Sequence, residues 1–274
     1  MFDPTVLSTR LEDNIAVVTL GSAKRIFLDS EMCEALLEAL TALANDEAVR
    51  VVVVTGGAPG YFARHYSVAE LVRTGERLQS SGRHFADDTP YKPTSFDRAL
   101  QIAERMPKPV IAAISGTAMG GAFELALACD IRIAQLGDFQ IGLPEINIGI
   151  LPGGGGTQRL PRVVGAAAAL MHILMGVAVS PADAEKKGFV HEATAGKAID
   201  RAMEIARRLT GHTPQSARHI KRLVRSALDM PLEEGLQLER NLFLDLAGSA
   251  EAIARMRRYD GMGITDPSHT LDIR

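Results

Sequence analysis

Four short runs of β-branched and small apolar residues set the strongest limit on how this chain can fold. A continuous apolar run of this kind suits a strand that is buried on both faces, as in a parallel sheet. A predicted helix or a long loop separates each run from the one before it, and this alternation is typical of an α/β fold. The predicted strands cover residues 15–20, 49–57, 110–114 and 131–134.

Helical periodicity fills much of the remaining sequence. Asp29 and Ser30 are the predicted N-caps of a helix that ends near residue 46. Shorter helices are predicted near 68–78 and over 99–105, on either side of a polar stretch punctuated by glycine and proline. Both lie in the long connection between the second and third strands, and connections of this length are usually functional or mobile.

The second half of the chain differs from the first because it is almost wholly helical from residue 182 onward. We therefore place a boundary near residue 200 without a flexible linker. The predicted α/β core covers residues 1–200, and the predicted helical region covers residues 201–274. The last dozen residues of the second region are expected to form a tail.

Charge and cysteine content exclude several classes of protein. The 33 acidic residues nearly balance the 30 basic ones, whereas proteins that bind nucleic acid usually show a clear basic excess. Cys33 and Cys129 cannot form a disulfide framework, so a reducing compartment such as the cytoplasm is expected. The N-terminus has no signal-peptide pattern, and the apolar stretch 165–179 is too short to span a membrane and is expected to be a buried helix. No nucleic acid or membrane partner is predicted.

Glu124 is the first candidate catalytic residue. It falls in the first turn of a helix that follows the strand 110–114 and the small-residue turn 115–121. Backbone N–H groups at a helix start have no partner within the helix, and the helix dipole adds positive potential there. A developing oxyanion is a natural ligand for such donors. A surface acid favoured by the dipole would occupy the same position, so both interpretations stay open.

Glu145 is the second candidate because it follows the strand 131–134 and a short extended segment. The carboxyl ends of parallel strands meet at one side of a sheet. Glu124 and Glu145 are therefore predicted to converge, and a pair of carboxylates can divide acid and base roles if their environments differ. The apolar neighbours Ile146 and Ile148 favour perturbed carboxylates. Two unrelated loop acids remain the alternative.

The glycine-rich segment 151–160 matches neither the P-loop nor the dinucleotide fingerprint. It is either a tight turn with Thr157 as N-cap or a loop whose N–H groups approach water or substrate. No histidine pair has metal-ligand spacing and no Gly-x-Ser-x-Gly elbow occurs, so neither a metal site nor a serine triad is predicted.

Two long stretches resemble the enoyl-CoA hydratase/isomerase (crotonase) superfamily. They are IAAISGTAMGGAFELALACDIRIA over 111–134 and FQIGLPEINIGILPGGGGTQRLPRVVG over 139–165, and the resemblance extends over residues 15–256. It implies a spiral of ββα turns followed by C-terminal helices, assembled as a homotrimer or a dimer of trimers. It also implies an acyl-CoA thioester substrate and no separate cofactor, since coenzyme A is part of the substrate.

The resemblance carries roles to individual residues. Tyr66 and Gly121 match the two backbone N–H donors that hold the thioester oxygen. Glu124 and Glu145 match the two catalytic glutamates of hydratases, and Gly153 matches the glycine whose N–H faces the reacting water. Further substrate contacts are implied at Lys24, Arg25, Ile26, Ala63, His65, Ser67 and Met119.

The sequence also departs from the pattern of this superfamily. The usual Gly-Ala-Asp turn is replaced by His65-Tyr66-Ser67, and the usual Asn-Ala-Leu by Phe27-Leu28. The first change restricts the turn and brings a phenol to the site. The segment 67–108 is also longer than in other members.

Hydration of a trans-2-enoyl-CoA is the predicted reaction, because both glutamates are kept. An isomerase needs only one base, and a β-diketone hydrolase would use histidines, for which His65 is a candidate. The other alternative is an RNA-binding or scaffolding member. The net charge of −3 argues against RNA, although Arg255, Arg257 and Arg258 form a basic cluster.

Overall fold

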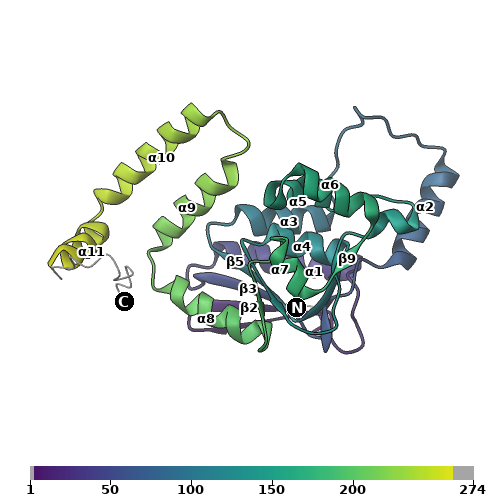
Figure 1. Cartoon of the computed structure of the whole chain (residues 1–274), viewed down its shortest axis with the longest axis horizontal. Helices are drawn as coiled ribbons and strands as arrows, with labels where there is room; N and C mark the ends of the chain where they lie inside the picture. The colour runs from purple at the N-terminus through teal and green to yellow at the C-terminus, as the bar shows by residue number, and fades with distance from the viewer. Residues whose placement is uncertain (1–2, 262–274) are drawn as a thin grey trace. The chain divides into compact units, whose positions relative to one another are not determined.

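A computed structural model of the chain describes residues 3–261 and divides it into two compact units, one ending at Thr210 and the other beginning at Gly211. The first unit holds two sheets and eight helices among its described residues (Figure 1). Its strands are β1 (Leu7–Glu12), β2 (Ile15–Leu20), β3 (Val51–Gly56), β4 (Gly60–Ala63), β5 (Val110–Ile114), β6 (Gly116–Met119), β7 (Ile131–Gln135), β8 (Ile141–Gly142), β9 (Ala178–Val179) and β10 (Glu192–Thr194). Its helices are α1 (Ser30–Asn45), α2 (Val68–Ser81), α3 (Ser95–Arg105), α4 (Gly121–Ala128), α5 (Gly156–Val164), α6 (Ala166–Met175), α7 (Pro181–Lys186) and α8 (Ala198–Thr210).

The large sheet has the strand order β1-β2-β3-β5-β7-β10. β1 pairs with β2 in antiparallel fashion and every other neighbouring pair is parallel. β2, β3, β5 and β7 are the four predicted strands, and all residues of β5 are buried, as expected for a strand covered on both faces. Asp29 caps α1 by accepting a hydrogen bond from the backbone of Met32, as predicted.

A second, small sheet with the order β4-β6-β8-β9 was not expected from the sequence. Its strands have only two to four residues, and such lengths leave no alternating pattern to detect. The strands β3, β5 and β7 of the large sheet lead into β4, β6 and β8 of the small one, and a helix follows each pair. The predicted α/β class and the spiral of ββα turns are therefore confirmed.

The small sheet positions the candidate catalytic residues. β4, β6 and β8 are neighbouring parallel strands, so their carboxyl ends lie together at one edge. The chain reaches Tyr66 shortly after β4, Gly121 directly after β6, and Glu145 shortly after β8. The sequence predicted this convergence from the strands of the large sheet, whereas the small sheet provides it.

The large sheet buries side chains on both of its faces. One face packs with α1, α3 and α4 in the main hydrophobic core (Figure 1). The other face packs against α8, which contributes Ala198, Ala202, Met203 and Ala206. The predicted boundary near residue 200 falls inside α8. This helix belongs to the first unit because its apolar stripe covers the sheet.

The apolar stretch 165–179 forms α6, but the expectation of a buried helix is wrong. Only Ala169 of this helix is buried, while Leu170, Met171, Leu174 and Met175 are 58–64% exposed. A short helix at the surface of a core buries one narrow stripe and leaves its other sides open.

The second unit is helical, as predicted, with α9 (Pro214–Ser226), α10 (Leu232–Ala247) and α11 (Ala250–Gly261). α9 contacts α10 through Gln215, which donates a hydrogen bond of 2.9 Å to Asp245. Residues 263–274, the predicted tail, lie outside the described residues. Among residues 3–261 no helix combines the length and apolar character that crossing a membrane requires.

Candidate active site

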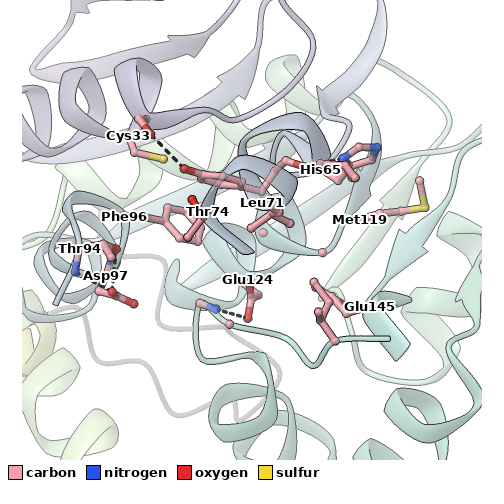
Figure 2. Close-up of a pocket in the computed structure, with 18 of the residues that line it drawn as sticks. Cys33, His65, Leu71, Thr74, Thr94, Phe96, Asp97, Met119, Glu124 and Glu145 are labelled. Carbon is pink, nitrogen blue, oxygen red and sulfur yellow. Dashed lines mark hydrogen bonds between the residues drawn. The ribbon is translucent and has the colours of Figure 1, made fainter. Parts of the chain in front are cut away.

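A cavity of about 580 Å³ lies at the edge where β4, β6 and β8 end (Figure 2). Figure 2 shows Glu124 and Glu145 near one another along this cavity, on different segments of the chain. The other walls come from the first turns of α1, α2 and α3 and from the segment 144–154. Its apolar lining consists of Val68, Leu71, Phe96, Met119, Pro144, Ile148, Ile150 and Leu151.

Glu124 lies in the first turn of α4, and only 2% of its surface is exposed. Its Oε1 accepts hydrogen bonds from the backbone N–H groups of Gly154 (2.8 Å) and Gly156 (2.7 Å). A surface acid attracted by the helix dipole would be exposed to solvent, so that alternative is wrong. The carboxylate is instead held by the glycine-rich loop, inside the cavity.

The glycine-rich loop needs glycine where it touches Glu124. A Cβ atom at Gly154 would lie 2.7 Å from Glu124 Oε2, and one at Gly156 would lie 3.1 Å from Oε1. The loop enters α5 through Gly155, which has a φ of +91° and is the N-cap. The alternative with Thr157 as N-cap is therefore wrong, because α5 already begins at Gly156.

Arg159 holds the same loop from its other side. Its guanidinium forms two hydrogen bonds with the carboxylate of Glu104, at 2.7 and 2.8 Å, and donates another to the carbonyl of Gly154. Burial raises the pKa of Glu124, while the two loop N–H groups and the charge of Arg159 act in the opposite direction. The loop thus offers Glu124 two donors that favour its ionised form.

Glu145 begins a short 3-10 helix (Glu145–Ile148) and is half-buried. Its Oε2 is buried and has no hydrogen-bond partner among the described residues. Burial, together with the nearby charge of Glu124, raises the pKa of Glu145 to about 7. A Cβ atom at Gly120 would lie 2.9 Å from Glu145 Oε1, so this carboxylate rests on the turn that leads into α4. At neutral pH Glu145 can therefore hold or release a proton.

Tyr66 and Gly121 lie against each other beside these carboxylates. A Cβ atom at Gly121 would be 3.3 Å from the Cβ of Tyr66. Within residues 3–261, neither backbone N–H group donates a hydrogen bond to another protein group. Both residues line the cavity. Two neighbouring N–H groups without a protein acceptor form the arrangement that holds a developing oxyanion.

The structure brings together some of the sequence-predicted site residues and not others. All five predicted catalytic residues line the cavity, as do His65 and Met119. Five further predicted substrate contacts are not among the cavity-lining residues: Lys24, Arg25, Ile26, Ala63 and Ser67. Arg25 forms ion pairs with Asp29 and Glu31, both at 2.7 Å, and Ser67 caps α2.

Sequence reasoning missed the cavity wall formed by α2 and by the start of α3. Leu71 and Phe96 belong to the long connection 58–108, whose polar composition hid them. The amphipathic character of α2, with Val68 and Leu71 three residues apart, was the available signal. No group of three or more potential metal ligands occurs in the described part of the chain.

Comparison with known proteins identifies the family. The model of the enoyl-CoA hydratase/isomerase family matches residues 10–260. The chain belongs to this family. Among curated members, 2,3-dehydroadipyl-CoA hydratase of Escherichia coli (strain K12) is 31% identical over 265 residues, which cover 96% of each chain. Carnitinyl-CoA dehydratase of Salmonella paratyphi A is 31% identical and covers 83% of each chain.

Solved structures of the enoyl-CoA hydratase/isomerase family share the fold. A crystal structure of an enoyl-CoA hydratase from Bacillus anthracis has a TM-score of 0.82 and 27% identity. The match covers 94% of this chain and 96% of that one. Family members act on CoA thioesters, which agrees with a cavity that combines two backbone N–H groups with an apolar wall.

Proposed function

We propose that this chain adds water across the double bond of a trans-2-enoyl-CoA to give a 3-hydroxyacyl-CoA. One observation carries this proposal. Two carboxylates with raised pKa values, Glu124 and Glu145, line one cavity beside the N–H groups of Tyr66 and Gly121, which have no protein acceptor within residues 3–261. Hydration needs a base for water, an acid for carbon and donors for the thioester oxygen, and this site has a group for each.

The thioester oxygen would accept hydrogen bonds from the N–H groups of Tyr66 and Gly121. Negative charge moves onto this oxygen as water adds at C3, and the donors stabilise that charge. Loss of one such donor typically costs about 10²–10³ in rate. The N–H of Tyr66 lies shortly after β4 and that of Gly121 at the start of α4, and both residues line the cavity.

Glu124 would act as the base and Glu145 as the acid. Two N–H groups of the glycine-rich loop favour the ionised form of Glu124, and the ionised form accepts a proton from water. Glu145 has an oxygen that finds no hydrogen-bond partner in the described part of the chain and a pKa of about 7, which suits a group that donates a proton to C2 near neutral pH. Gly153 belongs to the same loop and lines the cavity, and its N–H would face the water.

A panel of substrates tests the proposed reaction on the purified protein. We expect loss of the enoyl absorbance with crotonyl-CoA and with longer trans-2-enoyl-CoAs, and a 3-hydroxyacyl-CoA product by mass spectrometry. Conversion of 3-enoyl-CoA alone would indicate an isomerase, and cleavage of a cyclic diketone would indicate a hydrolase that uses His65. Binding of RNA without turnover of any thioester would favour the scaffolding alternative.

A homotrimer or a dimer of trimers remains part of the proposal. Its support is a series of exposed apolar side chains on the helices of the second unit: Ile220, Val224, Leu232, Leu236, Phe243 and Leu244. Exposed apolar patches on a folded unit favour burial against another chain. Light scattering of the eluting protein is expected to give three or six times the chain mass of 29.4 kDa, and a monomeric mass would contradict the assembly.

A further inference from the structure

We propose that the side chain of Tyr66 is a positioning residue, whose hydroxyl is held by Glu70 and Ser30 so that the backbone N–H of Tyr66 stays aimed at the thioester oxygen. We call these three residues the Tyr66 clamp. The inference rests on the proposed function and goes beyond it, because it assigns a role to a phenol and to two residues that make no contact with the reacting atoms in that scheme.

The carboxylate of Glu70 is the centre of the clamp. Its Oε2 accepts hydrogen bonds from the Tyr66 hydroxyl (2.9 Å), the Ser30 hydroxyl (2.8 Å) and the Ser30 backbone N–H (3.0 Å). Ser30 is the first residue of α1, and Glu70 lies in the first turn of α2. The phenol is thereby tied to the starts of two helices that both line the cavity.

Protonation states agree with this arrangement of donors and acceptor. Burial by itself would raise the pKa of Glu70, but hydrogen bonds from Ser30 and Tyr66 outweigh it and hold that pKa below its usual value. Burial and the neighbouring Glu70 raise the pKa of Tyr66 to about 12. The phenol therefore stays protonated and donates to an ionised carboxylate, and hydrogen bonds of this charged type are among the stronger ones.

The backbone on both sides of Tyr66 is fixed as well. Leu28 donates its N–H to the carbonyl of His65 (3.0 Å) and accepts from the N–H of Ser67 (2.7 Å). The carbonyl of Tyr66 can only accept, so His65 donates to it through Nδ1–H at 2.7 Å. The N–H of Tyr66 lies between these paired groups and has no acceptor in the described chain.

The phenol hydroxyl completes the restraint on residue 66. The Tyr66 ring meets Phe96 at a centroid distance of 6.2 Å, and the Tyr66 Cβ lies close to Gly121. These apolar contacts permit small rotations of the Tyr66 side chain, whereas a hydrogen bond to a fixed carboxylate sets the direction in which its hydroxyl points. A misplacement of about 1 Å at a reacting centre can cost about 10² in rate. The clamp thus adds a side-chain restraint to a turn whose backbone is already held on both sides.

Tyr66→Phe tests the clamp because it removes only the hydroxyl. We expect kcat for crotonyl-CoA to fall about tenfold while KM changes less than about twofold, since the donor acts mainly in the transition state. A bound cinnamoyl-CoA chromophore, whose absorbance moves to longer wavelength when its carbonyl is polarised, is expected to show a smaller shift. Glu70→Gln should also lower kcat. Because both substitutions break the same hydrogen bond, the loss in the double variant should be smaller than the two single losses added together.

Tyr61→Phe is the matched control, because Tyr61 loses the same atom in β4 and does not line the cavity. If the wild type is active and Tyr66→Phe shows the same kcat and the same absorbance shift, the role of the clamp is wrong while the proposed function stands. A lower Tm without any change in those two readouts would make the phenol merely structural and would also overturn it. A wild type that hydrates no enoyl-CoA would overturn the proposed function itself, and that result is obtained before any variant is made.

Discussion

Glu124→Gln is expected to lower kcat for crotonyl-CoA hydration by about 10³-fold, within the range of about 10²–10⁴ typical of general acid–base groups. Glutamine cannot take a proton from water at neutral pH. The side-chain oxygen of glutamine can still accept hydrogen bonds from the N–H groups of Gly154 and Gly156, so these two N–H groups keep an acceptor. The dissociation constant for crotonyl-CoA, measured by calorimetry, should change less than about tenfold.

Glu38→Gln is the control for this substitution, because Glu38 is an exposed residue of α1 outside the cavity. It should keep wild-type kcat. If Glu124→Gln itself retained more than about a tenth of the wild-type rate, Glu124 would not be the base, and the division of roles between the two carboxylates would have to be abandoned.

Glu145→Gln is expected to reduce kcat by about 10²–10³-fold and to change how stability depends on pH. In the folded protein the pKa of Glu145 is raised from 4.5 to about 7. The folded state therefore holds this proton more tightly than the unfolded state does. The stability that Glu145 contributes is fully present below the unfolded pKa and is lost as pH rises through about 7.

Urea unfolding of wild type and Glu145→Gln at pH 5 and pH 8 measures this effect. Glutamine cannot ionise, so the variant should gain stability relative to wild type as pH rises, by about 2 kcal/mol after allowance for solvent screening. Glu47→Gln, an exposed substitution, should show no such gain. A pH-independent difference between Glu145→Gln and wild type would mean that Glu145 ionises normally in the folded protein.

The sequence predicted the elements that are long or continuously apolar. The four predicted strands of the large sheet have five or six mostly buried residues each, and α1 has a cap and a regular apolar stripe, so local patterns were sufficient. The small sheet escaped detection because β4, β6 and β8 are two to four residues long and their pairing depends on the spiral as a whole. Their position is a tertiary property that no local period records.

The candidate site was predictable in its residue types and not in its contacts. The glycines after β6 and before α5 indicated close backbone approach, and Glu124 and Glu145 were the acids beside them. The partners of Glu124 were not predictable, since backbone N–H groups carry no residue-specific signal. The clamp at Tyr66 was equally hidden, because Ser30 and Glu70 lie 36 and 4 residues away along the chain.

Because backbone N–H groups hold Glu124, the two carboxylates of the site respond differently to pH. Peptide N–H groups do not titrate in the range where proteins are folded, so the donors from Gly154 and Gly156 keep their protons at any working pH. The donors that orient Glu124 therefore do not change with pH. The buried oxygen of Glu145 has no such partner among the residues that the structure describes, and the carboxyl titrates with a pKa of about 7. A change of pH thus leaves the hydrogen-bond donors around Glu124 unchanged and alters the protonation of Glu145, within a single cavity.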